Sequence, residues 1–165
     1  MTMFPDDLTE EAVALLDICR KQGLMIASAE SCTGGLIAAC LTEIAGSSDV
    51  FDCGFVTYSN GAKQAMLGVN AATLEKFGAV SRETAMEMAL GALLNSRAGL
   101  SVAVTGIAGP GGGSAAKPVG LVHAAVCRSG AEPFHQEFLF NGRSREQVRM
   151  ATLRAALAMM KRAVQ

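Results

Sequence analysis

Short apolar runs alternate with helix-forming segments along the whole chain. Five apolar or β-rich runs predict strands, at residues 25–29, 51–58, 100–104, 119–127 and 134–140. Helical spacing and capping signals predict helices over residues 8–21, 36–41, 81–95 and 142–162, and a short helix after the turn at 59–61. Only the last two strands are joined by a short turn, so they should pair antiparallel. This order predicts an α/β fold: a three-layer α/β/α sandwich with a mixed, mostly parallel sheet of about five strands.

The last predicted helix is apolar on two opposite sides. One stripe contains Val148, Ala151, Ala155 and Met159, and the other contains Met150, Leu153, Leu157 and Met160. A helix with two apolar sides is covered twice. The second cover is either another helix or another subunit, and the latter would make the protein a homodimer or a higher homo-oligomer.

The composition narrows the class of protein. The 165 residues fit a single domain over residues 1–165, and 50% apolar with 18% charged residues excludes intrinsic disorder. A net charge of −1 without a basic stripe argues against a nucleic-acid partner. No apolar run is long enough to span a bilayer, and acidic residues stand where a signal peptide is basic. We therefore expect a cytoplasmic protein without a membrane partner.

Cysteine and histidine usage points away from disulfides and metals. The five cysteines form no C-x-x-C pair, and the only histidines, His123 and His135, have no neighbouring ligand residues in the sequence. We expect reduced, mostly buried thiols and no metal site.

A first loop with candidate chemistry covers residues 29–35. It follows a predicted strand and precedes a helix, so free N–H groups and the helix dipole make it a natural anion site. Ser31 is a candidate N-cap, and Ser31 and Thr33 add hydroxyls. Cys32 in the same loop is a candidate low-pKa thiolate or a small buried residue. An ordinary helix start is the alternative interpretation.

A second region combines Ser47 and Ser48 with Tyr58 and Lys63. A serine hydroxyl needs a base to attack, and a desolvated lysine with a lowered pKa can serve. Lys63 lies in an otherwise uncharged stretch, which suits a neutral lysine if its side chain is buried. The alternative is that the serines belong to a turn and Lys63 is solvated.

A third loop, residues 105–114 leading to 117–120, leaves the end of a predicted strand and is rich in glycine. Ligands of open α/β sheets bind outside the carboxyl ends of strands, so the loop favours binding, although a flexible surface loop has the same composition. Arg143, Arg145 and Arg149 lie at the start of the last helix, where a cation opposes the dipole unless an anion is nearby.

Together these loops resemble the CinA C-terminal domain family. The matching stretches are A-E-S-C-T-G-G-L-I-A at 29–38, G-S-S at 46–48, V-T-Y-S-N-G-A-K at 56–63, A-V-S at 79–81, V-T-G-I-A-G-P-G-G-G-S at 104–114 and K-P-V-G at 117–120. The chain departs from the family pattern at Ala45, where relatives have proline, and at Cys53, where they tend to have glycine. Neither change removes a candidate catalytic group.

The resemblance implies a three-layer α/β/α fold and a hydrolase. The enzyme would deamidate nicotinamide mononucleotide to nicotinic acid mononucleotide and ammonia, without metal or redox cofactor. It implies Ser48 as the preferred nucleophile, Lys63 as general base and Tyr58 as a polar partner in proton transfer or oxyanion support. The implied substrate-binding residues are Ser31, Thr33, Gly34, Thr105, Gly106, Ala108, Gly109 and Arg145, with Arg145 on the phosphate or another polar group of the nucleotide.

Three alternatives stay open. Ser31 is the alternative nucleophile, because a serine at a helix start faces backbone N–H groups that stabilise an oxyanion. A non-catalytic nucleotide-binding or regulatory module, of the competence/damage-inducible type, would use the same loops for binding alone. A Cys32-dependent amidase would be inactivated by thiol reagents. The sequence also leaves open the substrate range and whether residues 109–117 close over a ligand.

Overall fold

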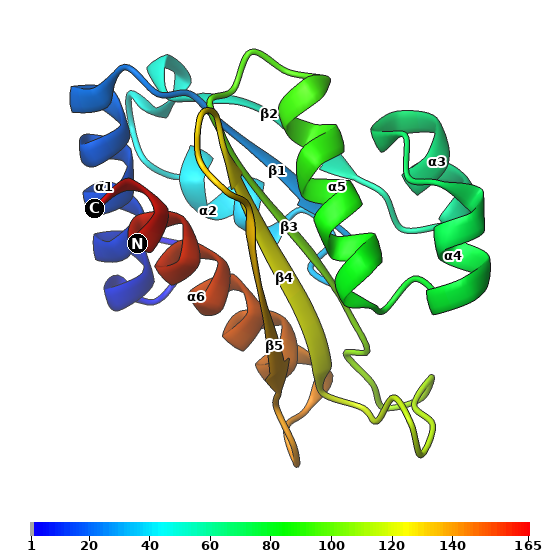
Figure 1. The fold of residues 1–165 in the computed structure, drawn as a ribbon. Helices are drawn as coiled ribbons and strands as arrows, with labels where there is room; N and C mark the ends of the chain where they lie inside the picture. Colours follow the sequence, from blue (N-terminus) through cyan, green and yellow to red (C-terminus); the bar gives the residue numbers. More distant parts are fainter. Residues whose placement is uncertain (1) are drawn as a thin grey trace.

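The computed structural model describes residues 2–165 and contains one five-stranded sheet in the order β2-β1-β3-β4-β5. The strands are β1 (Ile26–Glu30), β2 (Phe51–Val56), β3 (Leu100–Gly106), β4 (Leu121–Arg128) and β5 (Phe134–Leu139). The helices are α1 (Asp6–Gln22), α2 (Leu36–Thr42), α3 (Asn60–Leu67), α4 (Ala71–Phe77), α5 (Arg82–Leu94) and α6 (Arg145–Val164), with a 3₁₀ turn, η1 (Ser47–Asp49). Helices cover both faces of the sheet (Figure 1), which confirms the predicted three-layer α/β sandwich.

The sheet is mixed, as predicted. β1 pairs in parallel with both β2 and β3, whereas β4 runs antiparallel to β3 and β5. The β4–β5 hairpin confirms the antiparallel pairing that the short connection predicted. The parallel strands β1, β2 and β3 share one direction, so their carboxyl ends meet at one edge of the sheet. The first and third candidate loops and the Tyr58–Lys63 part of the second region leave from that edge, whereas Ser47 and Ser48 precede β2 at the opposite edge.

Alternating side chains of the central strands build two cores. Ile26, Leu100 and Val102 belong to the core shared with α1, α2 and α6. On the other face, small residues such as Ala29 and Ala103 allow α5 to pack closely against the sheet, with α3 and α4 beside it. This distribution follows from the period of two along a strand.

The second apolar stripe of α6 is covered within the chain. The buried face of α1, which contains Leu8, Leu15 and Leu16, packs in the same core as Leu153 and Leu157 of α6. Figure 1 shows α1 beside α6, and the Gln22 side chain at the end of α1 donates to the Val164 carbonyl at the end of α6. The helix alternative is therefore confirmed, and the two stripes give no reason to expect an oligomer.

Sequence patterns missed α4 and η1. Both are short, and α4 contains one fully buried residue, Leu74, so no apolar periodicity announces it. Its ends are nevertheless defined, because the Asn70 side chain accepts from the Ala72 N–H at the start and Gly78 follows the last residue. The predicted cap at Ser81 is confirmed: its hydroxyl accepts from the Thr84 N–H of α5.

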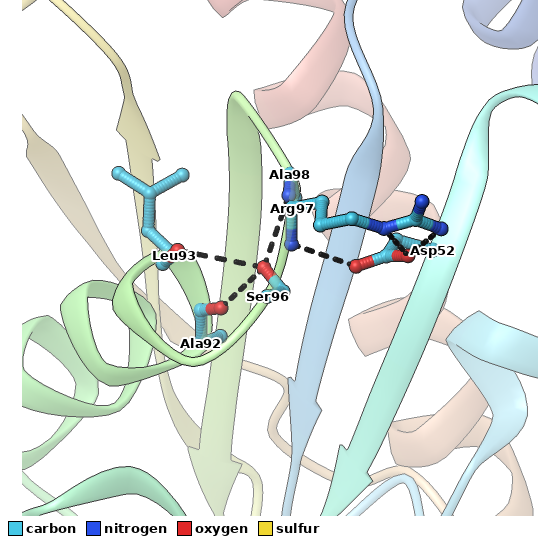
Figure 2. A network of polar contacts seen from close by, with 6 residues as sticks. All are labelled: Asp52, Ala92, Leu93, Ser96, Arg97 and Ala98. Carbon is cyan, nitrogen blue, oxygen red and sulfur yellow. Dashed lines mark hydrogen bonds and ion pairs between the residues drawn. The ribbon is translucent and has the colours of Figure 1, made fainter.

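A polar network fixes the turn between α5 and β3 at the amino ends of the strands (Figure 2). Asp52 of β2 accepts from the Arg97 main-chain N–H at 2.8 Å and from its guanidinium at 3.0 and 3.2 Å. These contacts hold the pKa of Asp52 below its ordinary value. Ser96 ties the same turn to the end of α5, because its hydroxyl donates to the Ala92 carbonyl and accepts from the Ala98 N–H.

Two sequence expectations on cysteines and membrane spans can be compared with the structure. All five cysteines are free, and four of them are buried. Over the described residues, every helix lacks the combination of length and apolar character that crossing a bilayer requires.

Candidate active site

A cavity of about 270 Å³ lies at the carboxyl edge of β1, β2 and β3. Ser31, Tyr58 and Lys63 line it from the segments that follow β1 and β2. Arg145 lines it from the start of α6, and the glycine-rich loop contributes Thr105, Gly106, Ala108 and Gly109. The structure therefore brings most of the predicted site residues to one place, although they are scattered over more than a hundred positions of the chain.

Lys63 and Ser31 form the polar centre of this cavity. Lys63 Nζ lies 3.0 Å from Ser31 Oγ and donates to the Thr57 carbonyl at 2.7 Å. The Lys63 side chain is 1% exposed and Ser31 is 9% exposed. Lys63 thus meets the condition, left open by the sequence, that its side chain is buried. The Nζ–Oγ distance is within the range for proton transfer between a nucleophile and its base.

Burial changes the acid–base behaviour of Lys63. Removal from water disfavours the ammonium form and lowers the pKa of Lys63 below its ordinary value of 10.5. Among the described residues, none forms a salt bridge with Lys63 that would oppose this effect. A neutral amine has one lone pair, and the neighbouring Ser31 hydroxyl is placed to donate to it.

The position of Lys63 depends on a close contact between α3 and α5. Lys63 lies in the first turn of α3, where the Ser59 hydroxyl accepts from the Ala62 N–H. At the other end of α3, a Cβ on Gly91 of α5 would collide with the Leu67 carbonyl. Glycine at position 91 thus allows α3, the helix that contains Lys63, to pack closely against α5.

The structure does not bring Ser48 to Lys63. Ser48 is exposed in η1, which precedes β2, whereas Lys63 follows β2. The six residues of β2 separate the two ends by about 20 Å. Within the described chain, Ser48 is therefore not the hydrogen-bond partner of Lys63, and Ser31, the alternative nucleophile, occupies that position.

Glu30, which sequence reasoning missed, organises the loop that contains Ser31. Its side chain is fully buried at the end of β1, and its carboxylate accepts five hydrogen bonds. The donors are the hydroxyls of Ser28 and Thr33 and the main-chain N–H groups of Gly35, Ile37 and Ala38, at 2.6–3.2 Å. An acidic residue at the end of a buried strand, directly before a helix start, is the signal that marks such a cap.

The structure corrects three predictions for the first loop. Gly35, not Ser31, is the N-cap residue of α2, and the Glu30 carboxylate takes the N–H groups there. The expected anion site at this helix start is therefore already filled by the protein. Thr33 and Gly34 do not line the cavity: the Thr33 hydroxyl donates to Glu30 at 2.6 Å, and Gly34 is exposed.

Arg149 holds the same loop from the opposite side. Its guanidinium donates to the carbonyls of Cys32 at 3.2 Å and Thr33 at 2.9 Å. The expectation of a nearby anion does not hold for this arginine, because main-chain carbonyls are its partners. Glu30 and Arg149 together fix the main chain that follows Ser31.

We expect Glu30→Gln to destabilise the fold by about 1–3 kcal/mol. The substituted amide nitrogen cannot accept, so at least one buried main-chain N–H loses its partner. Urea unfolding measures the change, with Glu75→Gln on the exposed side of α4 as the matched control, for which less than about 0.5 kcal/mol is expected. Equal unfolding free energies for the two variants would contradict this account of Glu30.

The glycine-rich loop is attached to the rest of the site at two points. The Arg145 guanidinium donates to the Gly109 carbonyl at 2.7 Å, and the Lys117 ammonium donates to the Phe77 carbonyl. Gly109 has φ of +83°, and a Cβ there would collide with Val119, so only glycine fits. The two ends of this segment, Gly109 and Lys117, are thus held, whereas residues 110–116 between them are exposed.

Unpaired main-chain donors surround the cavity. Within the described part of the chain, no acceptor is within hydrogen-bond range of the N–H groups of Cys32, Ala108, Gly109, Gly111 and Gly112, all of which belong to lining residues. Together with the Arg145 guanidinium they make this cavity, rather than the start of α2, the candidate position for an anion.

Cys32 and the histidines contribute no obvious nucleophile. Burial raises the pKa of the Cys32 thiol to about 12, which disfavours the thiolate that a cysteine amidase needs. His123 Nδ1 lies 2.8 Å from His135 Nε2, on strands β4 and β5, and neither residue lines this cavity. The serine–lysine pair is therefore the best-placed nucleophilic group.

Fold and site define a class: a three-layer α/β domain with a buried serine–lysine pair beside a glycine-rich loop. Residues 8–164 match the family described as the CinA C-terminal domain. The chain belongs to this family, which confirms the resemblance of its motifs.

Relatives in the family differ in length and in name. A nicotinamide-nucleotide amidohydrolase PncC from Enterobacter agglomerans is 49% identical over 143 residues, which cover 87% of each chain. A CinA-like protein from Geotalea daltonii is 49% identical over 161 residues, which cover 97% of this chain and 38% of that relative. The chain spans between 35% and 38% of several such longer curated relatives.

Solved structures of the family have the same fold. The competence/damage inducible protein CihA from Agrobacterium tumefaciens is 56% identical, with a TM-score of 0.98 over 100% of both chains. A CinA superfamily protein from Klebsiella pneumoniae 700603 is 34% identical, with a TM-score of 0.90 over 95% of this chain and 97% of that chain.

Proposed function

We propose that the protein hydrolyses the amide of nicotinamide mononucleotide, with Ser31 as nucleophile and Lys63 as general base. The observation that carries the proposal is the buried Lys63 Nζ, 3.0 Å from Ser31 Oγ and without a salt-bridge partner among the described residues. The name of the amidohydrolase from Enterobacter agglomerans, at 49% identity, supports the choice of substrate.

The reaction proceeds through an acyl-enzyme. Neutral Lys63 accepts the Ser31 proton while Oγ attacks the carboxamide carbon, and unpaired N–H groups at the cavity stabilise the oxyanion. The Lys63 ammonium then returns the proton to the departing nitrogen, which leaves as ammonia when the C–N bond breaks. Water, deprotonated by the same lysine, hydrolyses the ester and releases the carboxylic acid product and the serine hydroxyl.

The rest of the cavity binds the nucleotide. Arg145 and the N–H groups of Gly109, Gly111 and Gly112 supply positive potential and donors for the phosphate. Arg145 stays in place without ligand because its guanidinium donates to Gly109 and to Tyr58 Oη, at 2.7 and 3.1 Å. A pre-oriented cation of this kind reduces the entropy lost on binding.

Purified protein incubated with nicotinamide mononucleotide is expected to release ammonia and nicotinic acid mononucleotide in equal amounts. Free nicotinamide, which lacks the phosphate that Arg145 recognises, should be turned over with kcat/KM lower by about 10²-fold or more. A coupled ammonia assay and chromatography of the acid measure both products. Saturable binding of the nucleotide without either product would instead support the non-catalytic binding module.

A further inference from the structure

The cavity contains positive but no negative charge. The Arg145 guanidinium supplies the positive charge, Lys63 is the other basic lining side chain, and none of the described residues that line the cavity is acidic. The phosphate of the proposed substrate suits this charge, but its nicotinamide ring is a pyridinium cation, for which a carboxylate would be the usual partner. The positive ring therefore needs a different partner.

The one aromatic ring among the described lining residues belongs to Tyr58. Its negatively polarised face attracts cations, and a cation over a tyrosine ring is worth about 0.5–2 kcal/mol. The side chain is 65% exposed, so most of its surface is not covered by protein although it lines the cavity. A flat cation entering the cavity can therefore stack on it.

Tyr58 also has the right position between the two ends of the site. It directly follows Thr57, whose carbonyl accepts from Lys63 Nζ, and its Oη accepts from the Arg145 guanidinium at 3.1 Å. The ring thus lies between the reacting end and the phosphate end of the cavity. Nicotinamide mononucleotide has the same order of groups: carboxamide, pyridinium, ribose and phosphate.

The hydroxyl of Tyr58 is less suited to proton transfer, the role that the family resemblance implied. It accepts from Arg145, whereas Ser31 and Thr57 are the hydrogen-bond partners that the structure gives to Lys63. A role for the ring and a role for the hydroxyl make different predictions for Tyr58→Phe.

We propose that Tyr58 is a specificity-determining residue that recognises the cationic pyridinium ring by stacking and selects oxidised over reduced pyridine mononucleotides. The proposal rests on the proposed function, which supplies the substrate. Reduced nicotinamide mononucleotide is the decisive probe, because it keeps the carboxamide, ribose and phosphate but its dihydropyridine ring is neutral.

The test measures dissociation constants of the oxidised and reduced mononucleotides by calorimetry. All proteins in the comparison contain the Ser31→Ala substitution, so that neither ligand is consumed. Three such proteins are compared: one with Tyr58 retained, one with Tyr58→Phe and one with Tyr58→Leu. We expect Tyr58→Leu to weaken oxidised-ligand binding by about 3–30-fold and reduced-ligand binding by less than about 2-fold. Tyr58→Phe should retain the wild-type ratio of the two constants, because the ring remains.

Two results would overturn the assignment. One is an equal loss of affinity for both ligands in Tyr58→Leu, which would indicate that Tyr58 packs against the ring without recognising its charge. The other is a loss of the ratio in Tyr58→Phe, which would give the hydroxyl the discriminating role. The separate assay of wild-type turnover tests the hydrolase proposal alone. If the wild type does not hydrolyse the mononucleotide but Tyr58 still favours the oxidised ligand, the hydrolase proposal is overturned and recognition of the pyridinium ring is supported.

Discussion

Ser31→Ala is expected to lower kcat for nicotinamide mononucleotide by about 10⁴-fold or more, the scale seen when a catalytic serine is removed. Its Oγ is the hydroxyl that contacts Lys63 Nζ, at 3.0 Å in the cavity. The main chain of the loop is held by Glu30 and Arg149 through groups other than the Ser31 side chain, so the variant should fold normally. Ammonia release over hours, with circular dichroism as a check on folding, measures the effect.

Ser48→Ala is the matched control. The substitution is the same, but Ser48 is exposed in η1 at the opposite end of β2, so kcat should change by less than about two-fold. Inactive Ser48→Ala together with active Ser31→Ala would overturn the assignment and restore Ser48 as nucleophile. Loss of activity in both variants would show that η1 contributes to the site through contacts absent from the single chain.

Much of the fold follows from local patterns. The apolar runs at β1 and β3 and the Ser81 cap of α5 depend on residues close together in the sequence, so they can be predicted from it. The local sequence could not show what buries the second apolar stripe of α6. Whether a second subunit or another helix buries its second stripe depends on where α1 packs, and that is a tertiary contact between residues more than a hundred positions apart.

The candidate site, like the fold, combines features that the local sequence predicts with features that depend on tertiary contacts. The uncharged stretch around Lys63 marked it as a candidate base but did not decide between a buried and a solvated side chain, because burial depends on how α3 packs against the rest of the chain. Its partner was misassigned because Ser48 is close in sequence, whereas β2 carries the chain to the other end of the sheet. Ser31 reaches Lys63 only because β1 and β2 are parallel neighbours. The sequence marks Glu30 only as an acidic residue between a buried strand and a helix, and does not show the five donors that its carboxylate binds.

Lys63→Met is expected to lower kcat/KM by about 10³-fold or more, because it removes the base while keeping the length and shape of the side chain. Lys63→Arg should be equally inactive, since a guanidinium stays protonated and cannot accept the Ser31 proton. In the wild type, kcat/KM should rise with pH as Lys63 loses its proton, with a midpoint below the ordinary lysine value of 10.5. Near wild-type activity in Lys63→Arg would show that position 63 supplies only positive charge.

The same substitution should stabilise the fold, which separates loss of chemistry from loss of structure. In the native state burial lowers the pKa of Lys63, so between that pKa and 10.5 the unfolded chain binds one more proton than the folded chain. Wild-type stability therefore rises with pH across this window. Lys63→Met lacks the buried ammonium, so its advantage in urea unfolding should be largest at neutral pH and should shrink as the pH approaches 10.5. A less stable Lys63→Met protein at neutral pH would mean that the ammonium is compensated in the native state, and Lys63 would then be a poor base.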